Sequence, residues 1–484
     1  MTNDQKDNVT LFKQWGLPLD EISELGDRLA AFWHYFGQWT RTKTRDTSQY
    51  GLSYVSGLLR MEANRNFANI GRKTDVSVQN MHHFMSNSPW SGAALIKKVR
   101  ADVAAQDEFQ SGNMLFLDES ADDKSGTHTV GSGRQYNGRR GKVDNCIMGV
   151  FLSFVDASCQ YHTWIDGELF LTQDWFSSAW AEQRRQAGVP DDRIFQTKPE
   201  LGWQMLQRVQ AAGFPFVAVA CDTLYGRNTW LRDQMTAAGM EYYADVPADT
   251  KVYLQPPVFG LPQNKREQKP GKKPAKPLVL APHAVRVDSL RQDPALLWQR
   301  ITLRPSERGM LQADFARCRV WTVRQDQTVV AEWLLIRRDG QRHTYTFSNA
   351  PLHIPLLTMA QRKSARYFIE RSNQDAKSGL GWDEFQAIKL RAWEHQLALT
   401  ILASWFITET RLDWSRRFAR DPELLARYEV EVLPALSMAN VRAMLTAAMP
   451  LPQLSPEEAT CLVVKHLDNR TRSRKSRLRS NSSP

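Results

Sequence analysis

The spacing of apolar residues divides the chain into a helical first part and a mixed second part. In the first part, apolar residues recur at intervals of three and four, which places them on one face of a helix. The clearest set is Ile22, Leu25, Leu29, Phe32 and Phe36. We therefore expect the N-terminal region to consist of packed helices.

From Asn113 onward, short apolar runs typical of strands appear and later alternate with helical patterns. The expected strands cover residues 114–117, 147–155, 161–171, 216–221 and 242–246, and the expected helices cover residues 174–186, 201–212 and 228–238. Strands that come first and then alternate with helices describe a mixed sheet with helices on its faces. The pattern therefore predicts an α/β fold.

A proline-rich and basic segment separates this region from a second β-rich stretch. Residues 255–282 hold seven prolines and six basic residues, which predicts an extended, mobile segment. Strand-like runs follow as far as Phe347, and we expect this stretch to be an excursion from the main sheet. Helical sequence resumes at Leu356, and residues 387–407 are apolar on most sides, as in a buried helix.

Two short helices are expected between Tyr54 and Trp90, joined near the turn-like residues 69–72. Such a pair resembles a helix-turn-helix, which presents polar side chains to DNA. The available side chains are Arg65, Arg72, Lys73, Gln79, Asn80 and His82. A packed bundle with a solvated polar face explains the same pattern equally well, so both interpretations stay open.

The charge of the chain favours a polyanionic partner. The 484 residues carry a formal charge of +11, and nucleic acid is the first candidate. The N-terminal residues lack the order of a signal peptide, and the longest apolar span, residues 397–407, is too short to cross a bilayer. Five scattered cysteines predict reduced thiols. We expect a cytoplasmic protein without a membrane partner.

Three acidic residues stand in settings that suit metal-dependent chemistry. Asp118 and Asp222 each close an apolar, strand-like run, and Glu370 lies in a helical stretch. Two strand-end carboxylates and one helical carboxylate can hold a pair of Mg²⁺ ions for phosphodiester chemistry. Each residue also has a simpler explanation, because a lone strand-end Asp is more often a turn or helix cap than a metal ligand.

Several segments resemble the DDE transposases of bacterial insertion sequences. The group is that of the IS-four and IS-seven-hundred-and-one-like transposases, in which a β-rich domain interrupts the catalytic fold. The matching segments are residues 115–120, 128–136, 141–146, 222–226 and 369–377 with Leu380-Gly381. They follow the family's order over roughly residues 50 to 415.

The resemblance implies an RNase H-like core in which Asp118, Asp222 and Glu370 are the catalytic ligands of two Mg²⁺ ions, with Mn²⁺ as a substitute. It also implies phosphate contacts by Arg366 and Lys377, which lie four residues before Glu370 and seven after it. In a continuous helix these offsets share one face. An ordinary ion pair between Arg366 and Glu370 is the simpler alternative.

One position departs from the family. A Tyr often stands three residues before the Arg, where this chain has Lys363. The role of that Tyr in binding the DNA ends therefore does not carry over.

Other candidate DNA contacts are basic or aromatic. A glycine-rich loop after the first expected strand carries Lys124, Arg134, Arg139, Arg140 and Lys142, which could touch phosphates or simply be solvated. In the β-rich stretch, Trp298 is near arginines and is the candidate for stacking on a flipped base. Six basic residues between Arg470 and Arg479 predict a disordered tail that holds DNA by charge.

With the resemblance included, the patterns predict five regions. They are a helical N-terminal DNA-binding region (1–110), the first part of an RNase H-like catalytic core (111–254), a basic linker and β-rich insertion (255–350), the second part of the core with the Glu-bearing helix (351–415), and a helical C-terminal region with a basic tail (416–484).

These features predict a transposase that binds double-stranded DNA at the terminal inverted repeats of its element. It would cleave there, transfer the 3′ ends to target DNA and self-associate in a synaptic complex, since two ends must meet. Two alternatives stay open. One is a non-catalytic DNA-binding protein derived from a transposase, and the other is a metal-dependent nuclease without strand transfer.

Overall fold

The computed structural model describes residues 19–124, 126–138, 140–260, 278–306, 309–418 and 438–451. Its N-terminal region is helical, as the apolar spacing predicts. The helices are α2 (Leu19–Ser23), α3 (Leu25–Phe36), α4 (Ser48–Arg60), α5 (Phe67–Lys73), α6 (Val78–Ser86) and α7 (Gly92–Ala104). Asn66, Ser77 and Ser91 cap α5, α6 and α7, because each side chain accepts a hydrogen bond from a backbone N–H of the first turn.

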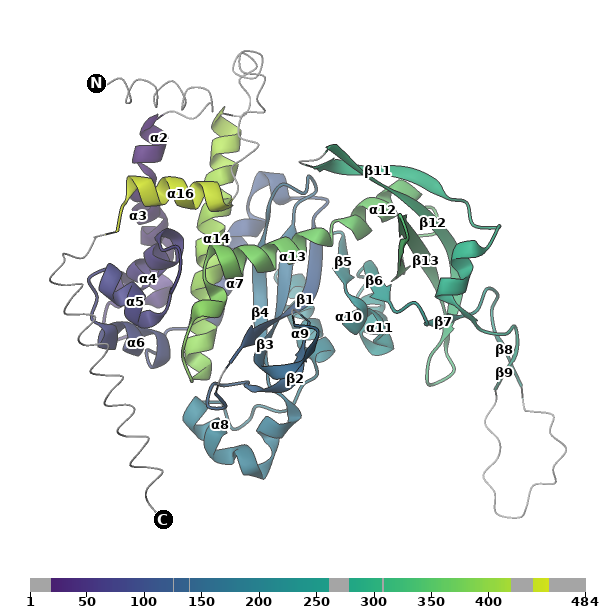
Figure 1. The fold of residues 1–484 in the computed structure, drawn as a ribbon, viewed down its shortest axis with the longest axis horizontal. Helices are drawn as coiled ribbons and strands as arrows, with labels where there is room; N and C mark the ends of the chain where they lie inside the picture. Colours follow the sequence, from purple (N-terminus) through teal and green to yellow (C-terminus); the bar gives the residue numbers. More distant parts are fainter. Residues whose placement is uncertain are drawn as a thin grey trace.

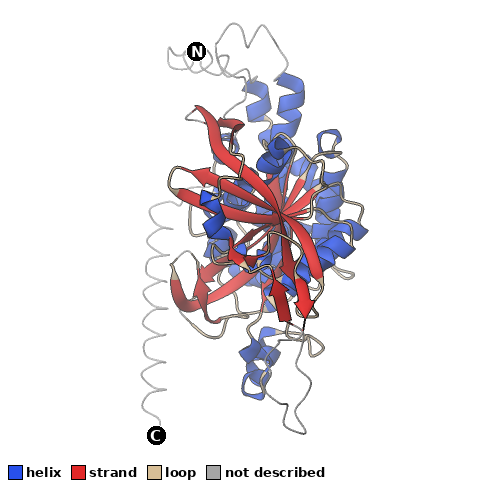
Figure 2. Cartoon of the chain, turned by 90° about the vertical axis from the view of Figure 1, so that its right-hand side faces the viewer, coloured by secondary structure: helices blue, strands red, loops and turns tan. Residues whose placement is uncertain are grey.

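The strands of the described residues form one large mixed sheet and two small two-stranded sheets. The large sheet has ten strands, in the order β11-β12-β13-β14-β6-β5-β1-β3-β2, with β4 also paired to β3. Its first six strands along the chain are β1 (Met114–Asp123), β2 (Gly133–Asn137), β3 (Lys142–Val155), β4 (His162–Phe170), β5 (Ala218–Cys221) and β6 (Tyr242–Val246). Figure 2 shows how strongly this sheet twists.

Two differences from the predicted elements concern this part of the chain. The loop expected between the first two strands contains β2, which pairs with an early start of β3. The helix expected over residues 174–186 is replaced by the short 3₁₀ turns Gln173–Phe176 and Ser178–Trp180 and by α8 (Ala181–Ala187). The break occurs because Ser177 has an extended backbone.

Helices cover both faces of the central strands. On one face, Leu115 and Leu117 of β1 pack with buried residues of α9 (Lys198–Ala211) and α11 (Thr229–Ala237). On the other face, Met114 and Phe116 pack with buried residues of α12 (Leu356–Ser364) and α13 (Tyr367–Gln374). Because side chains alternate along a strand, the next even-numbered residue, Asp118, belongs to the face of α12 and α13.

The β-rich stretch continues the central sheet. Its strands are β11 (Gln299–Ser306), β12 (Gly309–Val323), β13 (Val329–Asp339) and β14 (Arg342–Ser348), and β14 pairs antiparallel with β6. An excursion from the sheet was expected, but backbone hydrogen bonds join these strands to it edge to edge (Figure 1). Smaller strands precede them, namely β7 (Lys251–Val252), β8 (Val258–Gly260), β9 (Leu278–Ala281) and β10 (Val285–Arg286). Most of the proline-rich segment, residues 261–277, lies outside the described residues.

A long buried helix joins the N-terminal helices to the sheet. This helix, α14 (Leu390–Phe418), stands between α3 to α6 on one side and β4 on the other, and α7 packs against both α14 and β4 (Figure 1). Trp393, Trp405 and Trp414 of α14 are buried, as the apolar pattern predicts. The last described helix is α16 (Met438–Ala448). A search of the described helices finds none with the length and apolarity needed to span a membrane.

Candidate active site

The register of two parallel strands brings Asp118 and Asp222 together. In β1 and β5, Leu117 lies opposite Cys221, so the residues that follow them stand side by side. Strand β5 ends at Cys221, but β1 continues to Asp123 because β3 pairs with it as far as Cys146. Asp118 was expected to close its strand, and it lies in the middle of one.

A third carboxylate, that of Glu119, joins the pair. One oxygen each of Asp118, Glu119 and Asp222 lie within 4.8 Å of one another. Glu119 forms an ion pair of 3.1 Å with Lys198 at the start of α9. The sequence analysis did not predict Glu119 as a member of the cluster. Its position directly after Asp118 was a possible signal, but the sequence of one strand does not show which residues of other strands lie beside it.

Backbone hydrogen bonds fix the two aspartates. The Asp118 Oδ1 atom accepts a hydrogen bond of 2.9 Å from the backbone N–H of Glu119. Asp222 caps α10 (Thr223–Gly226), and its Oδ1 atom accepts a bond of 2.9 Å from the N–H of Leu224. Asp222 is therefore both a helix cap and a member of the acidic cluster. Its role as a cap does not exclude a role as a metal ligand.

The cluster gathers negative charge in a half-buried setting. Burial, with the neighbouring charges of Asp222 and Glu119, raises the pKa of Asp118 to about 7, although Arg366 opposes the shift. Burial and the charge of Glu119 also raise the pKa of Asp222. The positive charges of the protein therefore do not fully balance the negative charge of the ionised carboxylates, and a bound cation would balance it.

Glu370 lies on the helix that faces this cluster, but outside the group of three. Its side chain is 64% exposed and forms an ion pair of 3.7 Å with Arg366. Burial acts to lower the pKa of Arg366. The charges of four nearby carboxylates outweigh this effect and raise the pKa, and they belong to Asp118, Asp245, Asp222 and Glu370. Arg366 thus connects Glu370 to the two aspartates electrostatically.

Lys377 is placed differently from the expected helical offset. Helix α13 begins after Arg366 and ends at Gln374, and Lys377 lies in the following π-helical turn, Asp375–Gly379. Its Nζ atom donates a hydrogen bond to the carbonyl oxygen of Ala121 in β1. The stretch is therefore not one continuous α-helix, because the helix type changes between Glu370 and Lys377.

Lys363 is buried beside the site. Its Nζ atom donates to Asp245 Oδ2 of β6 at 2.5 Å, and Asp245 also lies 3.9 Å from Arg366. The position that often holds a Tyr in the family therefore serves an internal ion pair here.

The basic loop residues differ in their exposure. Arg134 is exposed, and Arg140 and Lys142 are exposed but lie against Asp144. Lys124 is only 13% exposed, because it pairs with Asp122 and lies over the Phe385 ring. Lys124 was expected at a solvated hairpin tip, and its burial contradicts that expectation. Arg139 lies outside the described residues.

The remaining candidate DNA contacts, in the β-rich strands and the N-terminal helices, also differ in exposure. Trp298 is partly buried, and the Arg338 guanidinium lies 4.3 Å from its ring centroid. In the N-terminal helices, Arg65 is 1% exposed and pairs with Glu384 at 2.9 Å, so its expected availability to DNA was wrong. The other polar candidates there are exposed or partly exposed, namely Arg72, Lys73, Gln79, Asn80 and His82.

The chemistry of the donor set fits a divalent cation. Asp118, Glu119 and Asp222 offer only carboxylate oxygens, which are the ligands that Mg²⁺, Mn²⁺ and Ca²⁺ prefer. The fold and the site together define an α/β protein whose central strands carry a half-buried acidic cluster suited to metal-dependent phosphodiester chemistry.

Comparison with known proteins agrees with this class. A family described as DDE superfamily endonuclease matches residues 34–310, which is more than half of the chain, so the chain belongs to that family. Its mixed sheet flanked by helices agrees with the RNase H-like fold class that the sequence predicted.

A curated relative points the same way. The chain is 31% identical over 150 residues to a protein of Microchaete diplosiphon named "Probable transposase for insertion sequence element IS701". The alignment covers 31% of this chain and 35% of that protein, so the chain spans about a third of the length of the curated relative it matches.

Proposed function

We propose that this protein is the transposase of a bacterial insertion sequence. It binds the terminal inverted repeats of its element, cleaves the DNA there and joins the 3′ ends to target DNA. The observation that carries this proposal is the half-buried cluster of Asp118, Glu119 and Asp222 in a member of the DDE endonuclease family. The name of the IS701 relative supports transposition as the purpose of the cleavage.

In this proposal, Asp118, Asp222 and Glu370 hold two Mg²⁺ ions, and Glu119 lies close enough to contribute a fourth carboxylate. A pair of Mg²⁺ ions bound by these carboxylates would supply Lewis-acid activation of the attacking oxygen and stabilisation of the leaving 3′-oxygen. Mn²⁺ can replace Mg²⁺, because both prefer carboxylate and water ligands. The exposure of Glu370 leaves it room to turn towards the cluster.

Arg366 and Lys377 have the role of holding DNA phosphates beside the metal ligands. Arg366 lies among the carboxylates, and Lys377 is anchored on β1 near Asp122. Exposed basic residues of the β2–β3 hairpin, Arg134 and Lys142, extend this positive surface. Phosphate contacts of this kind position the duplex without reading its sequence.

Two DNA ends have to be synapsed, so the protein acts as an oligomer on double-stranded DNA. The exposed polar side chains of α5 and α6 are the proposed readers of the end sequence. Short inverted repeats flanking the coding region, with a duplication of target sequence outside them, are the expected genomic signature.

The test uses the full chain with a DNA fragment that carries the flanking repeats and a supercoiled target plasmid. Wild-type protein with Mg²⁺ should release the ends and join them to the plasmid. Asp118→Asn and Asp222→Asn should remove both products and retain end binding. Asp123→Asn is the matched control, because Asp123 lies on the same strand but pairs with Arg140 at the surface.

The products also separate the alternatives. Cleavage without joined product would identify a metal-dependent nuclease. End binding without cleavage would identify a non-catalytic DNA-binding protein, and equal loss of binding and cleavage in Asp118→Asn would assign Asp118 a folding role.

A further inference from the structure

A buried ion pair lies between the β-rich strands and the turn that follows β5. Glu332, in the middle of β13, is fully buried, and Arg232 of α11 is 2% exposed. The Arg232 Nε atom donates to Glu332 Oε1 at 2.9 Å. Buried charges are retained only where partners satisfy them, so this pair needs an explanation.

Further donors hold the Glu332 carboxylate in one place. The Tyr242 hydroxyl donates to Oε1 at 2.5 Å, and the Thr322 hydroxyl donates to Oε2 at 2.7 Å. Burial acts to raise the pKa of Glu332, but the charge of Arg232 and these hydrogen bonds outweigh it and hold the pKa below its ordinary value. Glu332 is therefore an ionised anchor shared by β6, β12 and β13.

A second guanidinium nitrogen of Arg232 binds the turn that follows Asp222. Its Nη1 atom donates to the carbonyl oxygen of Gly226, the last residue of α10. The N–H of Gly226 in turn donates to the carbonyl oxygen of Asp222 at 2.7 Å. The four-residue helix between Asp222 and Gly226 is too short to hold its own geometry.

Close packing explains why the turn ends in glycine. A Cβ atom on Gly226 would lie 1.9 Å from the carbonyl oxygen of Asp245 in β6. The turn is therefore pressed against β6 on one side and held by Arg232 on the other. A planar guanidinium can serve Glu332 and Gly226 at once, whereas a lysine ammonium presents no such fixed fork.

We propose that Arg232, oriented by Glu332, is a positioning residue that sets the place of the Asp222 carboxylate in the metal site. The β-rich strands thereby determine the geometry of the catalytic cluster, although they supply none of its carboxylates. This inference rests on the proposed role of Asp222 as a metal ligand.

The test measures Mn²⁺ affinity of the full-length protein by calorimetric titration without DNA, together with cleavage of element ends. The double variant Arg232→Met with Glu332→Gln removes both charges of this pair, and neutral replacement of a buried pair is often tolerated by the fold. Arg324, which also lies 3.6 Å from Glu332, keeps its ion pair with Asp233. Mn²⁺ affinity should fall by roughly tenfold or more, as for other residues that orient metal ligands. Binding of the DNA ends should stay unchanged.

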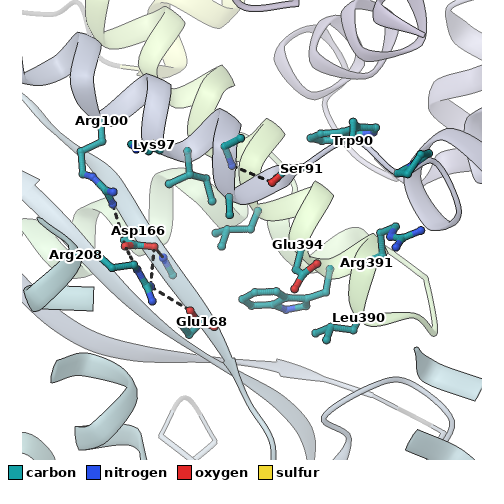
Figure 3. Close-up of a pocket in the computed structure, with 18 of the residues that line it drawn as sticks. Trp90, Ser91, Lys97, Arg100, Asp166, Glu168, Arg208, Leu390, Arg391 and Glu394 are labelled. Carbon is teal, nitrogen blue, oxygen red and sulfur yellow. Dashed lines mark hydrogen bonds and ion pairs between the residues drawn. The ribbon is translucent and has the colours of Figure 1, made fainter. Parts of the chain in front are cut away.

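A second buried pair provides the matched control. Arg100 and Asp166 lie 3.0 Å apart, each 7% exposed, beside a cavity between α7, β4 and α14 (Figure 3). Arg100→Met with Asp166→Asn should keep the Mn²⁺ affinity of wild type. Arg232→Lys keeps the charge opposite Glu332, so it carries the same test if the double variant does not fold, and it should also weaken Mn²⁺ binding.

The outcomes separate this inference from the proposed function. Wild-type protein that neither binds Mn²⁺ nor cleaves would overturn the proposed function itself. If wild type does both and the Arg232 variants match its Mn²⁺ affinity, the positioning role is overturned. Equal weakening in the Arg100 control would overturn it too, because a general loss of packing would then account for the effect.

Discussion

Replacing Asp118 by Asn should stabilise the metal-free protein above neutral pH while it abolishes DNA cleavage. The Asp118 carboxylate is partly buried next to Asp222 and Glu119, and its ionised form is unfavourable there. Asn keeps the shape of the side chain and removes the charge. The same charge that destabilises the empty cluster is the one that binds the cation, so stability and activity should change in opposite directions.

The size of the effect follows from the pKa of Asp118, which burial raises from 3.8 to about 7. Because the folded-state pKa lies above the unfolded one, this group contributes stability at low pH that is lost as the pH rises through 7. At pH 8 the folded group is ionised, and it costs the folded state at most about 4 kcal/mol relative to acid. At pH 5.5 the folded group still holds its proton while the unfolded one is ionised, and the cost is about 2 kcal/mol. The advantage of Asp118→Asn should therefore grow by about 2 kcal/mol between these pH values.

Urea denaturation in EDTA at both pH values, followed by circular dichroism, measures this difference. Adding Mg²⁺ at pH 8 should stabilise the wild type and leave Asp118→Asn unchanged, because only the wild type retains the full set of ligands. Asp123→Asn serves as the control and should show no gain, since Asp123 pairs with Arg140 at the surface. A variant less stable than wild type at pH 8, or a margin independent of pH, would refute the electrostatic argument.

Three further predictions concern other parts of the protein. Glu370→Gln should abolish cleavage and leave both end binding and the melting temperature near wild type, because this exposed side chain has little role in packing; a large drop in melting temperature would argue for a structural role. Gly226→Ala should destabilise the protein by about 1–3 kcal/mol or more and reduce cleavage, since its Cβ would collide with the backbone of Asp245; wild-type values in denaturation and cleavage assays would contradict the tight packing. Deleting the residues after Asn469, which lie outside the described residues, should weaken binding to cognate and scrambled DNA alike and flatten the salt dependence; selective loss of cognate binding in a salt titration would show that the tail reads sequence.

The sequence by itself determined most of the central strands and helices and the place of two of the acidic residues along the chain, although it did not predict β2 or the break near Ser177. Apolar runs before Asp118 and Asp222 predict strands, because a buried strand needs apolar side chains. The strand 242–246 and the buried helix within 387–407 also follow from their patterns. These features depend on local spacing, which a single chain shows directly.

The neighbours of each residue were decided only by the tertiary structure. Arg65 is polar and was expected at the surface, but Glu384, 319 residues away, supplies the charge that allows its burial. Lys363 is buried for the same reason, through Asp245 of β6. A local sequence pattern cannot predict the acidic partner of a buried basic residue, because the ion pair forms between segments distant in the chain.

Strand order is the clearest case of this kind. The apolar pattern predicted strand-like runs up to Phe347, but not that β14 pairs with β6 and extends the catalytic sheet. Pairing is made by backbone hydrogen bonds, which every residue type except proline can form in the same way. For the same reason, only the register of β1 and β5 shows that Glu119 stands with Asp118 and Asp222. The sequence thus determined the chemical groups, and the pairing of backbones determined which of them share a site.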